Sequence, residues 1–171
     1  MHHMLNNELS PNVRALEERL ISFIRAFGLH QPGQTPCGQP LSVSEAHALT
    51  ELQKDGGLTA SDLAKRLRLE KSTVSRLIAQ LEKRGWVERR PHPKDGRASA
   101  LYLSQQGQHV AGQVVTARHD KLTRLFDALP ESERAAVIGA LSTLTEALDE
   151  AVIENAPDDM SNEETMHATA L

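Results

Sequence analysis

The residues best suited to binding a ligand are the positive side chains gathered in the middle of this 171-residue chain. Eleven Lys and Arg residues lie between Leu58 and Tyr102 against five Asp and Glu residues, although the whole chain has a formal net charge of −4. An excess of six positive charges in one short stretch favours a face that binds a polyanion. The rest of the chain has an excess of acidic residues, so the net charge of the whole chain does not reveal this face.

Residues 71–84 are expected to form a helix with one apolar and one polar face. The apolar residues have the spacing of a single helical face, and Gly85 is suited to end the helix. These apolar residues are Val74, Leu77, Ile78 and Leu81. The other face offers hydroxyls and a long cation, which can bond phosphates and base edges, while small side chains let the backbone approach a groove. The candidate DNA contacts of this helix are Lys71, Ser72, Thr73, Ser75, Arg76 and Gln80.

A shorter helix is expected over residues 60–67, opened by Thr59 and Asp62. A short helix, a tight break and a second helix form the helix-turn-helix arrangement, although an ordinary helical hairpin is an equal alternative for the pair alone. Two strands follow at residues 86–91 and 98–103, joined by a tight turn. A hairpin in this position favours a winged helix-turn-helix that binds DNA.

The hairpin carries the second set of candidate DNA contacts, which are Arg89, Arg90, Lys94, Asp95 and Arg97. We expect Lys94 and Arg97, at its tip, to reach the DNA backbone or the adjacent minor groove. Phosphate would repel Asp95, so we expect it to accept bonds from turn amides and to orient Arg97. Arg89 and Arg90 point to opposite faces of the strand, and we expect one to face phosphate and the other to pair with an acid.

Amphipathic helices flank this unit on both sides. One is expected from Pro11 to Gly28, and another from Ser42 to Leu52 after a Pro- and Gly-rich loop. Two more follow the wing, the first capped by Ser104 and divided from the second at Pro130. In the first of these two helices we expect Val110, Val114, Leu122, Leu125 and Phe126 to point inward. The second carries apolar residues at near-heptad spacing, which are Val137, Leu141, Leu144, Leu148 and Val152. The apolar stripes of the flanking helices are too long for the helix-turn-helix and its wing to cover alone. This favours a second subunit that covers the remainder.

Three short motifs in this arrangement resemble the MarR family of bacterial transcription regulators. The first is Asp95 and Arg97 in the wing. The second, which precedes the wing, is Leu81-Glu82-Lys83 followed by Gly85, and the third, which follows the wing, is Leu103-Ser104 followed by Gly107. The resemblance covers about residues 11–152 in the order of elements and is tight over 58–107. It implies a homodimer on a near-palindromic double-stranded DNA operator, with repression relieved by a small-molecule effector. It also implies a ligand pocket near His47.

These observations together predict a mainly α fold with a small β-wing, built from about six helices and one two-stranded hairpin. We expect an N-terminal dimerisation helix and loop over residues 11–40 and a winged helix-turn-helix DNA-binding domain over residues 41–103. C-terminal dimerisation helices are expected over residues 104–153. Residues 154–171 are polar and acidic without periodicity, which is typical of a disordered tail.

Several other functions remain open at this level. Some MarR relatives sense oxidants through one cysteine, but Cys37 lies in a loop with no basic neighbour close in sequence. Zinc-responsive relatives use histidines near His47, yet no spacing typical of a metal site occurs, and we predict no metal and no cofactor. The chain also lacks the common motifs of enzymes, so we predict that it is not one. A winged-helix protein-interaction module and a non-specific chromosome-binding protein are the remaining alternatives.

The cysteine content and the apolar runs bear on where the protein acts. A single cysteine excludes an intrachain disulfide and fits a reducing compartment, so we expect a cytoplasmic protein. No apolar run approaches the roughly 20 residues that cross a bilayer, and we expect no membrane partner.

Overall fold

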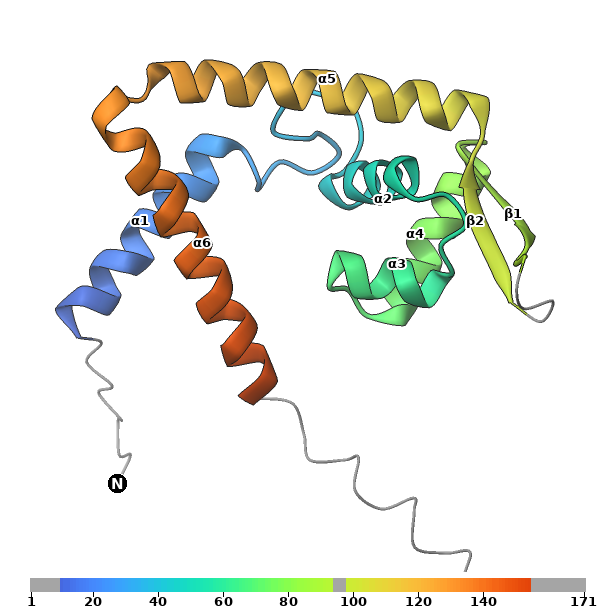
Figure 1. Cartoon of the computed structure of the whole chain (residues 1–171), viewed down its shortest axis with the longest axis horizontal. Coiled ribbons are helices and arrows are strands. Elements are labelled where there is room, and N and C mark those ends of the chain that lie inside the picture. The colour runs from blue at the N-terminus through green and yellow to red at the C-terminus, as the bar shows by residue number, and fades with distance from the viewer. Residues whose placement is uncertain (1–9, 94–97, 155–171) are drawn as a thin grey trace, which may run out of the picture. The chain divides into compact units, whose positions relative to one another are not determined.

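A computed structural model describes residues 10–93 and 98–154, with side chains to residue 151. Within these residues the elements follow in the order α1 (Pro11–Phe27), α2 (Val43–Lys54), α3 (Ala60–Leu67), α4 (Lys71–Lys83), β1 (Val87–Pro91), β2 (Ser99–Leu103), α5 (Gln105–Ala128) and α6 (Glu131–Glu154) (Figure 1). The predicted fold of six helices and one two-stranded hairpin is therefore confirmed. The chain divides into two compact units, residues 1–123 and 124–171. The tail predicted to be disordered lies, from residue 155 onward, outside the described residues.

The helices begin where the sequence places capping side chains. Ser10 Oγ accepts a hydrogen bond from Val13 N at the start of α1. Ser42 and Glu45 form a reciprocal capping box at α2, and Thr59 and Asp62 form another at α3. The pKa of Asp62 is lowered because its carboxylate accepts hydrogen bonds from Thr59. The bond from the Thr59 hydroxyl has the larger effect and the bond from the Thr59 backbone N–H the smaller. Local hydrogen bonding thus fixes three helix starts.

The bounds of some elements differ slightly from the prediction. β1 starts at Val87 rather than at Trp86, because the N–H of Trp86 bonds the carbonyl of Leu81 and closes the end of α4. β2 starts at Ser99, one residue later than predicted, and α2 continues two residues beyond Leu52. These shifts leave the order and type of every element unchanged.

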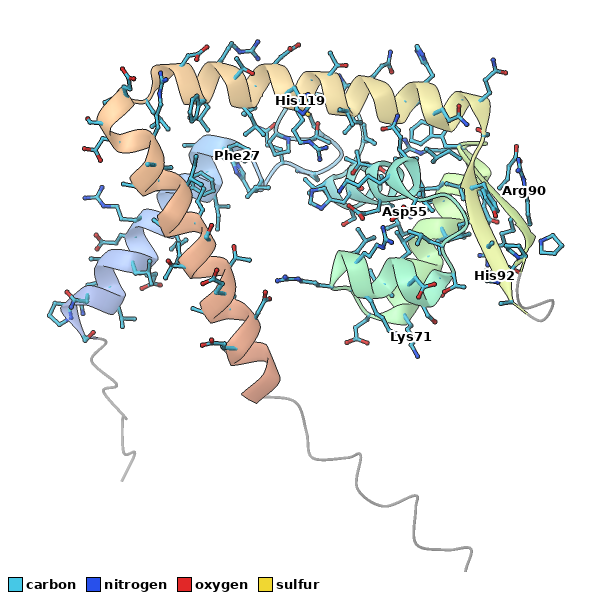
Figure 2. All side chains as sticks on the ribbon, viewed as in Figure 1. Phe27, Asp55, Lys71, Arg90, His92 and His119 are labelled. Atoms are coloured by element: carbon cyan, nitrogen blue, oxygen red, sulfur yellow. The ribbon has the colours of Figure 1, made fainter. Side chains whose placement is uncertain are left out.

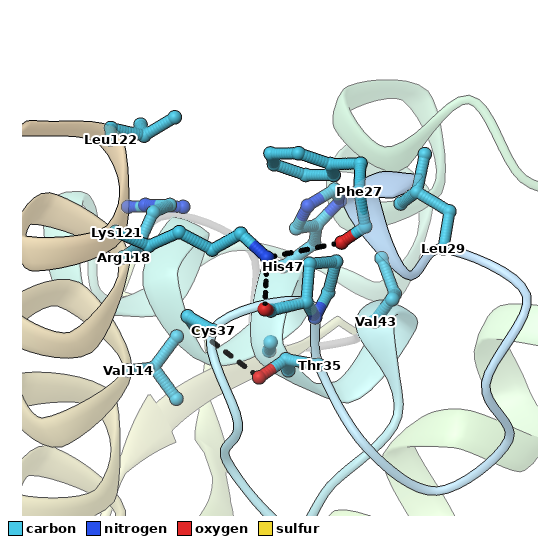
Figure 3. Close-up of a pocket in the computed structure, with 12 residues that line it drawn as sticks. Phe27, Leu29, Thr35, Cys37, Val43, His47, Val114, Arg118, Lys121 and Leu122 are labelled. Carbon is cyan, nitrogen blue, oxygen red and sulfur yellow. Dashed lines mark hydrogen bonds between the residues drawn. The ribbon is translucent and has the colours of Figure 1, made fainter. Parts of the chain in front are cut away.

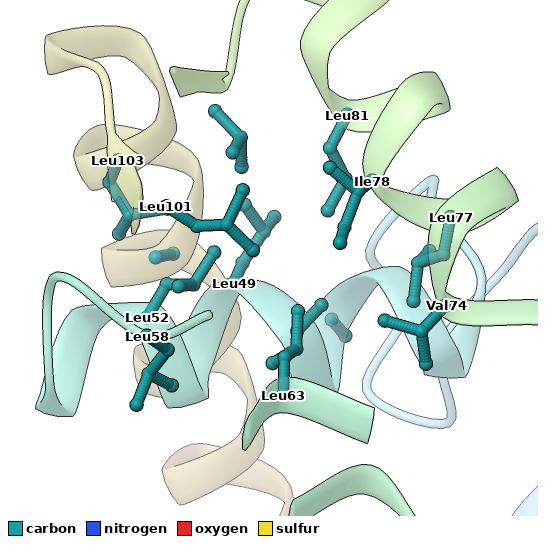
Figure 4. Packing of buried hydrophobic residues seen from close by; sticks show 14 of the residues in the cluster. Leu49, Leu52, Leu58, Leu63, Val74, Leu77, Ile78, Leu81, Leu101 and Leu103 are labelled. Atoms are coloured by element: carbon teal, nitrogen blue, oxygen red, sulfur yellow. The ribbon is translucent and has the colours of Figure 1, made fainter. Parts of the chain in front are cut away.

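The core of the first unit lies between α2, α3, α4 and the hairpin. Leu49 of α2, Leu63 of α3 and Ile78 of α4 are fully buried and face a common interior (Figure 4). β1 and β2 are antiparallel, with Val87 opposite Leu103. Burying such side chains supplies the main stabilisation of the helix-turn-helix and attaches the base of the wing to it.

The junction between the hairpin and α5 is built around Ser104. Its backbone N–H donates to the carbonyl of Trp86 at 3.0 Å, and its hydroxyl donates to the carbonyl of Gly85 at 2.6 Å. The same hydroxyl accepts the N–H of Gly107 at 3.0 Å and so caps α5, as predicted. A Cβ atom at Gly107 would lie 1.9 Å from the Trp86 carbonyl oxygen. The Ser104 and Gly107 motif therefore serves the contact between α5 and the end of α4.

The outer helices leave many apolar side chains exposed in the single chain. α1 contributes no buried residue to the described structure. The exposed apolar residues of α1 are Val13, Leu16, Leu20, Ile21, Phe23 and Ile24, and those of the second unit are Leu125, Phe126, Val137, Ile138, Leu141 and Leu148. The expectation that Leu122, Leu125 and Phe126 point inward is wrong for the isolated chain, where they are 41–45% exposed. These three residues continue the apolar face of α5 beyond Val114, which is the last buried residue of this helix.

Candidate nucleic-acid interface

The two faces of α4 are separated as its sequence pattern predicted. Val74, Ile78 and Leu81 are completely buried, so the opposite side of the helix faces outward. All six candidate contacts of this helix are exposed, namely Lys71, Ser72, Thr73, Ser75, Arg76 and Gln80. Figure 2 shows Lys71 at the start of α4, projecting from the surface. The helix therefore presents one continuous polar face with small residues at its N-terminal end.

Unlike the N-termini of α1, α2 and α3, that of α4 has no side-chain cap. Glu70 makes no side-chain capping hydrogen bond, and the first turn contains no acidic residue. Ser75 Oγ donates to the carbonyl of Lys71 at 2.9 Å, and Arg76 Nε donates to that of Ser72 at 3.4 Å. The unpaired N–H groups of a helix start carry a partial positive charge and bind anions. This end of α4 is thus suited to a phosphate group.

The turn between α3 and α4 is held by an unusual backbone conformation. Arg68 has φ 53° and ψ 44°, and among the described residues other than glycine only Arg68 has a positive φ. The left-handed conformation closes α3 with a hydrogen bond from Leu69 N to the carbonyl of Ala64 at 3.1 Å. The residue therefore sets the direction in which α4 leaves α3.

Most arginines of the middle stretch are engaged by carboxylates. Arg66 lies 2.7 Å from Asp55 and 3.3 Å from Glu51, and these contacts raise the pKa of Arg66. Arg84 lies 3.4 Å from the buried Glu45 and stacks on the Trp86 ring. In contrast, Lys71, Arg76 and Lys83 form no ion pair within residues 10–93 and 98–154. All three lie on α4, so this helix keeps unpaired positive charge, as does Lys65 on α3.

The strand arginines do not divide as expected. Arg89 Nε lies 2.8 Å from Glu82 on α4, and Arg90 lies 3.2 Å from Glu88. Arg90 also stacks over the ring of Tyr102 and is exposed on β1 (Figure 2). Both arginines thus pair with acids, because carboxylates lie within reach of each face of the strand. The predicted tip contacts, Lys94, Asp95 and Arg97, lie outside the described residues.

Comparison with known proteins bears on this arrangement. The model of the MarR family matches residues 41–99, which include the helix-turn-helix and most of the wing. An uncharacterised HTH-type transcriptional regulator of Mycobacterium leprae is 34% identical over 111 residues, which are 65% of this chain and 78% of that protein. The chain belongs to the MarR family.

Other MarR-type proteins agree with this assignment. The transcriptional repressor MprA of Escherichia coli is 32% identical over 84 residues, 49% of this chain and 48% of MprA. The fold is similar to that of Streptococcus pneumoniae FabT, solved in complex with DNA, with a TM-score of 0.70 and 22% identity over 81% of this chain and 99% of FabT. As a MarR-family protein the chain is a DNA-binding transcriptional regulator and not an enzyme. The predictions of family and function class are confirmed.

The MarR chain also contains a cavity of about 90 Å³ beside its winged module, the winged helix-turn-helix of residues 41–103 (Figure 3). Its apolar walls come from α1, α2, α5 and the connection between α1 and α2, and include Phe27, Leu29, Val43, Ala46, Val114 and Leu122. Its polar lining includes Cys37, His47, Arg118 and Lys121. Cys37 and His47 are already candidates from the sequence, whereas Arg118 and Lys121 of α5 are not. Their i, i+3 spacing on one helix face was the available signal.

Two further properties concern metals and membranes. Among the described residues, no three His, Cys, Asp or Glu side chains gather where they could hold a metal ion. Within the same part of the chain, every helix is too short or too polar to span a bilayer.

His47 borders the cavity from α2, and its pKa is lowered from the ordinary value of about 6.5. The main cause is burial of part of the ring, followed by the positive charge of Arg118. Lys54 lowers the pKa further, while the carboxylate of Glu51 opposes these effects. The neutral imidazole is therefore the favoured form in the folded chain near neutral pH.

This shift predicts a pH dependence of stability. The unfolded chain binds a proton at His47 more readily than the folded chain, so stability falls as pH drops below about 6.5 towards the lower folded pKa. His47→Gln is expected to lose less stability than the parent over this window, as measured by urea unfolding at about pH 7.5 and pH 5.5. The effect should be small because the side chain is only partly buried and water screens its charge. A His47 ring that titrates above the value of free histidine in NMR would contradict the prediction.

Proposed function

We propose that this MarR-family chain is a ligand-responsive repressor that binds a near-palindromic operator as a homodimer. The observation that carries the proposal is the exposed face of α4, where free cations lie beside an uncapped helix start. Such a helix fits the major groove, with phosphates bound at its N-terminus and bases read by its side chains. The proposed contacts are Lys71, Ser72, Thr73, Ser75, Arg76 and Gln80 on α4, with Arg89, Arg90, Lys94, Asp95 and Arg97 on the wing.

The dimer is proposed from the apolar side chains of the outer helices. Phe23 of α1 is 46% exposed and Leu148 of α6 is 63% exposed, and each belongs to a row of apolar residues on its helix. Large apolar surfaces of this kind are usually covered by a partner. We therefore assign dimerisation to residues 11–40 and 104–153. Two winged modules could then enter successive major grooves about 34–36 Å apart on one DNA face.

The cavity is the proposed site of the effector. It has apolar walls, a few polar groups and His47 at its border, the usual character of a small-molecule site. An effector would change DNA binding only through a difference in its affinity for two arrangements of the winged modules. Oxidation of Cys37 stays an alternative prediction. The proposed place of action is the cytoplasm, because that is where a bacterial regulator meets its operator.

Footprinting on the DNA that flanks the protein's own gene tests the proposal. We expect a protected, near-palindromic site that binds a dimer at least about 10³-fold more tightly than unrelated duplex. Affinity should fall steeply with salt, because neutralised phosphates release counterions. Equal affinity for unrelated duplex would support non-specific chromosome binding instead, and weak salt dependence would support a protein partner. Sedimentation at micromolar concentration should give a dimer, and a monomer would remove the proposed half-site geometry.

A further inference from the structure

A single lysine joins three separate parts of the cavity wall. Lys121 Nζ, on α5, donates to the carbonyl of Pro36 at 2.7 Å and to that of Phe27 at 3.1 Å (Figure 3). The ammonium group also lies 4.8 Å from the centre of the Phe27 ring. Phe27 is the last residue of α1, and Pro36 lies in the connection to α2. Lys121 thus binds segments that are 94 and 85 residues away from it in the sequence.

The two acceptors make this contact more than a chance surface bond. Phe27 is in the last turn of α1, where carbonyls have no partner within the helix and carry the negative end of its dipole. A cation there can donate a hydrogen bond to such a carbonyl and also interacts favourably with the negative end of the dipole. The Pro36 carbonyl belongs to a connection with few regular backbone bonds of its own. Lys121 is therefore a main attachment of this connection to α5.

The charges around the cavity make the attachment open to competition. Arg118 and Lys121 lie one turn apart on α5 and both line the cavity. Of the described residues that line it, none is an Asp or Glu. A charged acceptor forms a stronger hydrogen bond with an ammonium group than a neutral carbonyl does. An anionic group inside the cavity would consequently be the preferred partner of Lys121.

We propose that Lys121 is a latch that an anionic occupant of the cavity opens. The occupant draws the ammonium away from the carbonyls of Phe27 and Pro36 and releases the connection between α1 and α2. This connection leads from the helix assigned to dimerisation to the first helix of the winged module. Its release is the step by which occupancy alters DNA binding, so the inference rests on the proposed function and specifies how the cavity acts.

The only cysteine of the chain makes the latch directly testable. Cys37 lines the cavity and is partly exposed, so methanethiosulfonate reagents can attach a group inside it. The thiolate attacks the reagent sulfur, a disulfide forms and methanesulfinate leaves. The 2-sulfonatoethyl and 2-(trimethylammonio)ethyl reagents deliver groups of similar size and opposite charge. Both adducts of the full chain are compared with unlabelled protein by hydrogen exchange over residues 28–40 and by operator binding.

The anionic adduct is expected to accelerate amide exchange in residues 28–40 at least about tenfold and to weaken operator binding similarly. The cationic adduct should change both by less than about threefold. Equal effects of the two adducts would mean that bulk rather than charge acts, and would overturn the latch. Exchange is measured without DNA, so failure of the proposed operator leaves this comparison intact.

Two variants separate the latch from the general charge of the cavity. Lys121→Met keeps the aliphatic stem but removes the donors, so residues 28–40 should exchange faster without any label and both adducts should then behave alike. Arg118→Met removes the neighbouring cation and should preserve the difference between the adducts. Parent-like exchange in Lys121→Met would contradict the proposal. If that variant fails to fold, the labelled parent chain still decides the question.

Discussion

Replacing Gly107 with alanine is expected to lower the free energy of unfolding by about 3 kcal/mol, because the new methyl group has no room. Its Cβ would lie 1.9 Å from the carbonyl oxygen of Trp86 and 2.9 Å from the carbonyl carbon. Both atoms belong to backbone, so no side-chain rotation can relieve the contact. The same carbonyl accepts the N–H of Ser104, which means that a shift of α5 also breaks this hydrogen bond. Urea or thermal unfolding measures the loss, with a fall in melting temperature of about 5–10 °C.

Gly112→Ala on the same helix is the matched control. Nothing lies within 4 Å of the position where its Cβ would be, and alanine favours a helix over glycine by up to about 1 kcal/mol. Gly112→Ala should therefore be neutral or slightly stabilising, although both variants add one methyl group to α5. Equal stability of the two variants would mean that α5 does not approach the end of α4 as closely as described.

Arg76→Ala is expected to weaken operator binding by more than tenfold, a loss of at least about 1.4 kcal/mol. Arg76 is exposed on α4, and its bond to the Ser72 carbonyl uses Nε. The terminal guanidinium nitrogens stay available for a base edge or a phosphate. Gel-shift titration on the footprinted operator gives the affinity of the parent and the variant at matched salt concentrations.

Arg66→Ala is the control for this experiment, since it removes the same charge from the same module. The guanidinium of Arg66 is already held by Asp55 and Glu51, so we expect its loss to change DNA affinity by less than about threefold. Combining Arg76→Ala with Arg97→Ala should weaken binding further. Parent-like binding by that double variant would contradict the assigned contact face.

The salt dependence of Arg76→Ala separates two kinds of contact. Loss of a phosphate contact reduces the slope of log affinity against log salt by about 0.9, and weakens all sequences alike. Loss of a base contact leaves the slope unchanged and relaxes the preference at one position of the operator. Either outcome agrees with the proposed interface, and it assigns the role of the side chain.

The sequence predicted the elements that depend on short-range spacing. The i, i+3, i+4 pattern of Val74, Leu77 and Ile78 placed the buried face of α4, and hence the exposed face opposite. The capping side chains Ser42 and Thr59 marked where α2 and α3 begin. These features could be predicted because helix geometry fixes which residues three and four apart share a face or a hydrogen bond.

The sequence could not predict which cations are free. Arg84 and Glu45 are 39 positions apart in the sequence, yet they form an ion pair across the winged module. Because Arg89 and Arg90 point to opposite faces of the strand, different partners were expected for them. In the structure both pair with acids, Arg89 with Glu82 on α4 and Arg90 with Glu88 on β1. Ion pairing depends on the distance between elements, which packing sets and local sequence does not encode.

By itself, the sequence determined the helices, the wing, the family resemblance and the polar face of α4, since each follows from the spacing of neighbouring residues. Only the tertiary structure decided which positive charges stay unpaired, why Gly107 must be glycine and that Lys121 holds Phe27 and Pro36 together. The reason is physical. These properties arise between segments that are far apart along the chain and become neighbours only when the core forms.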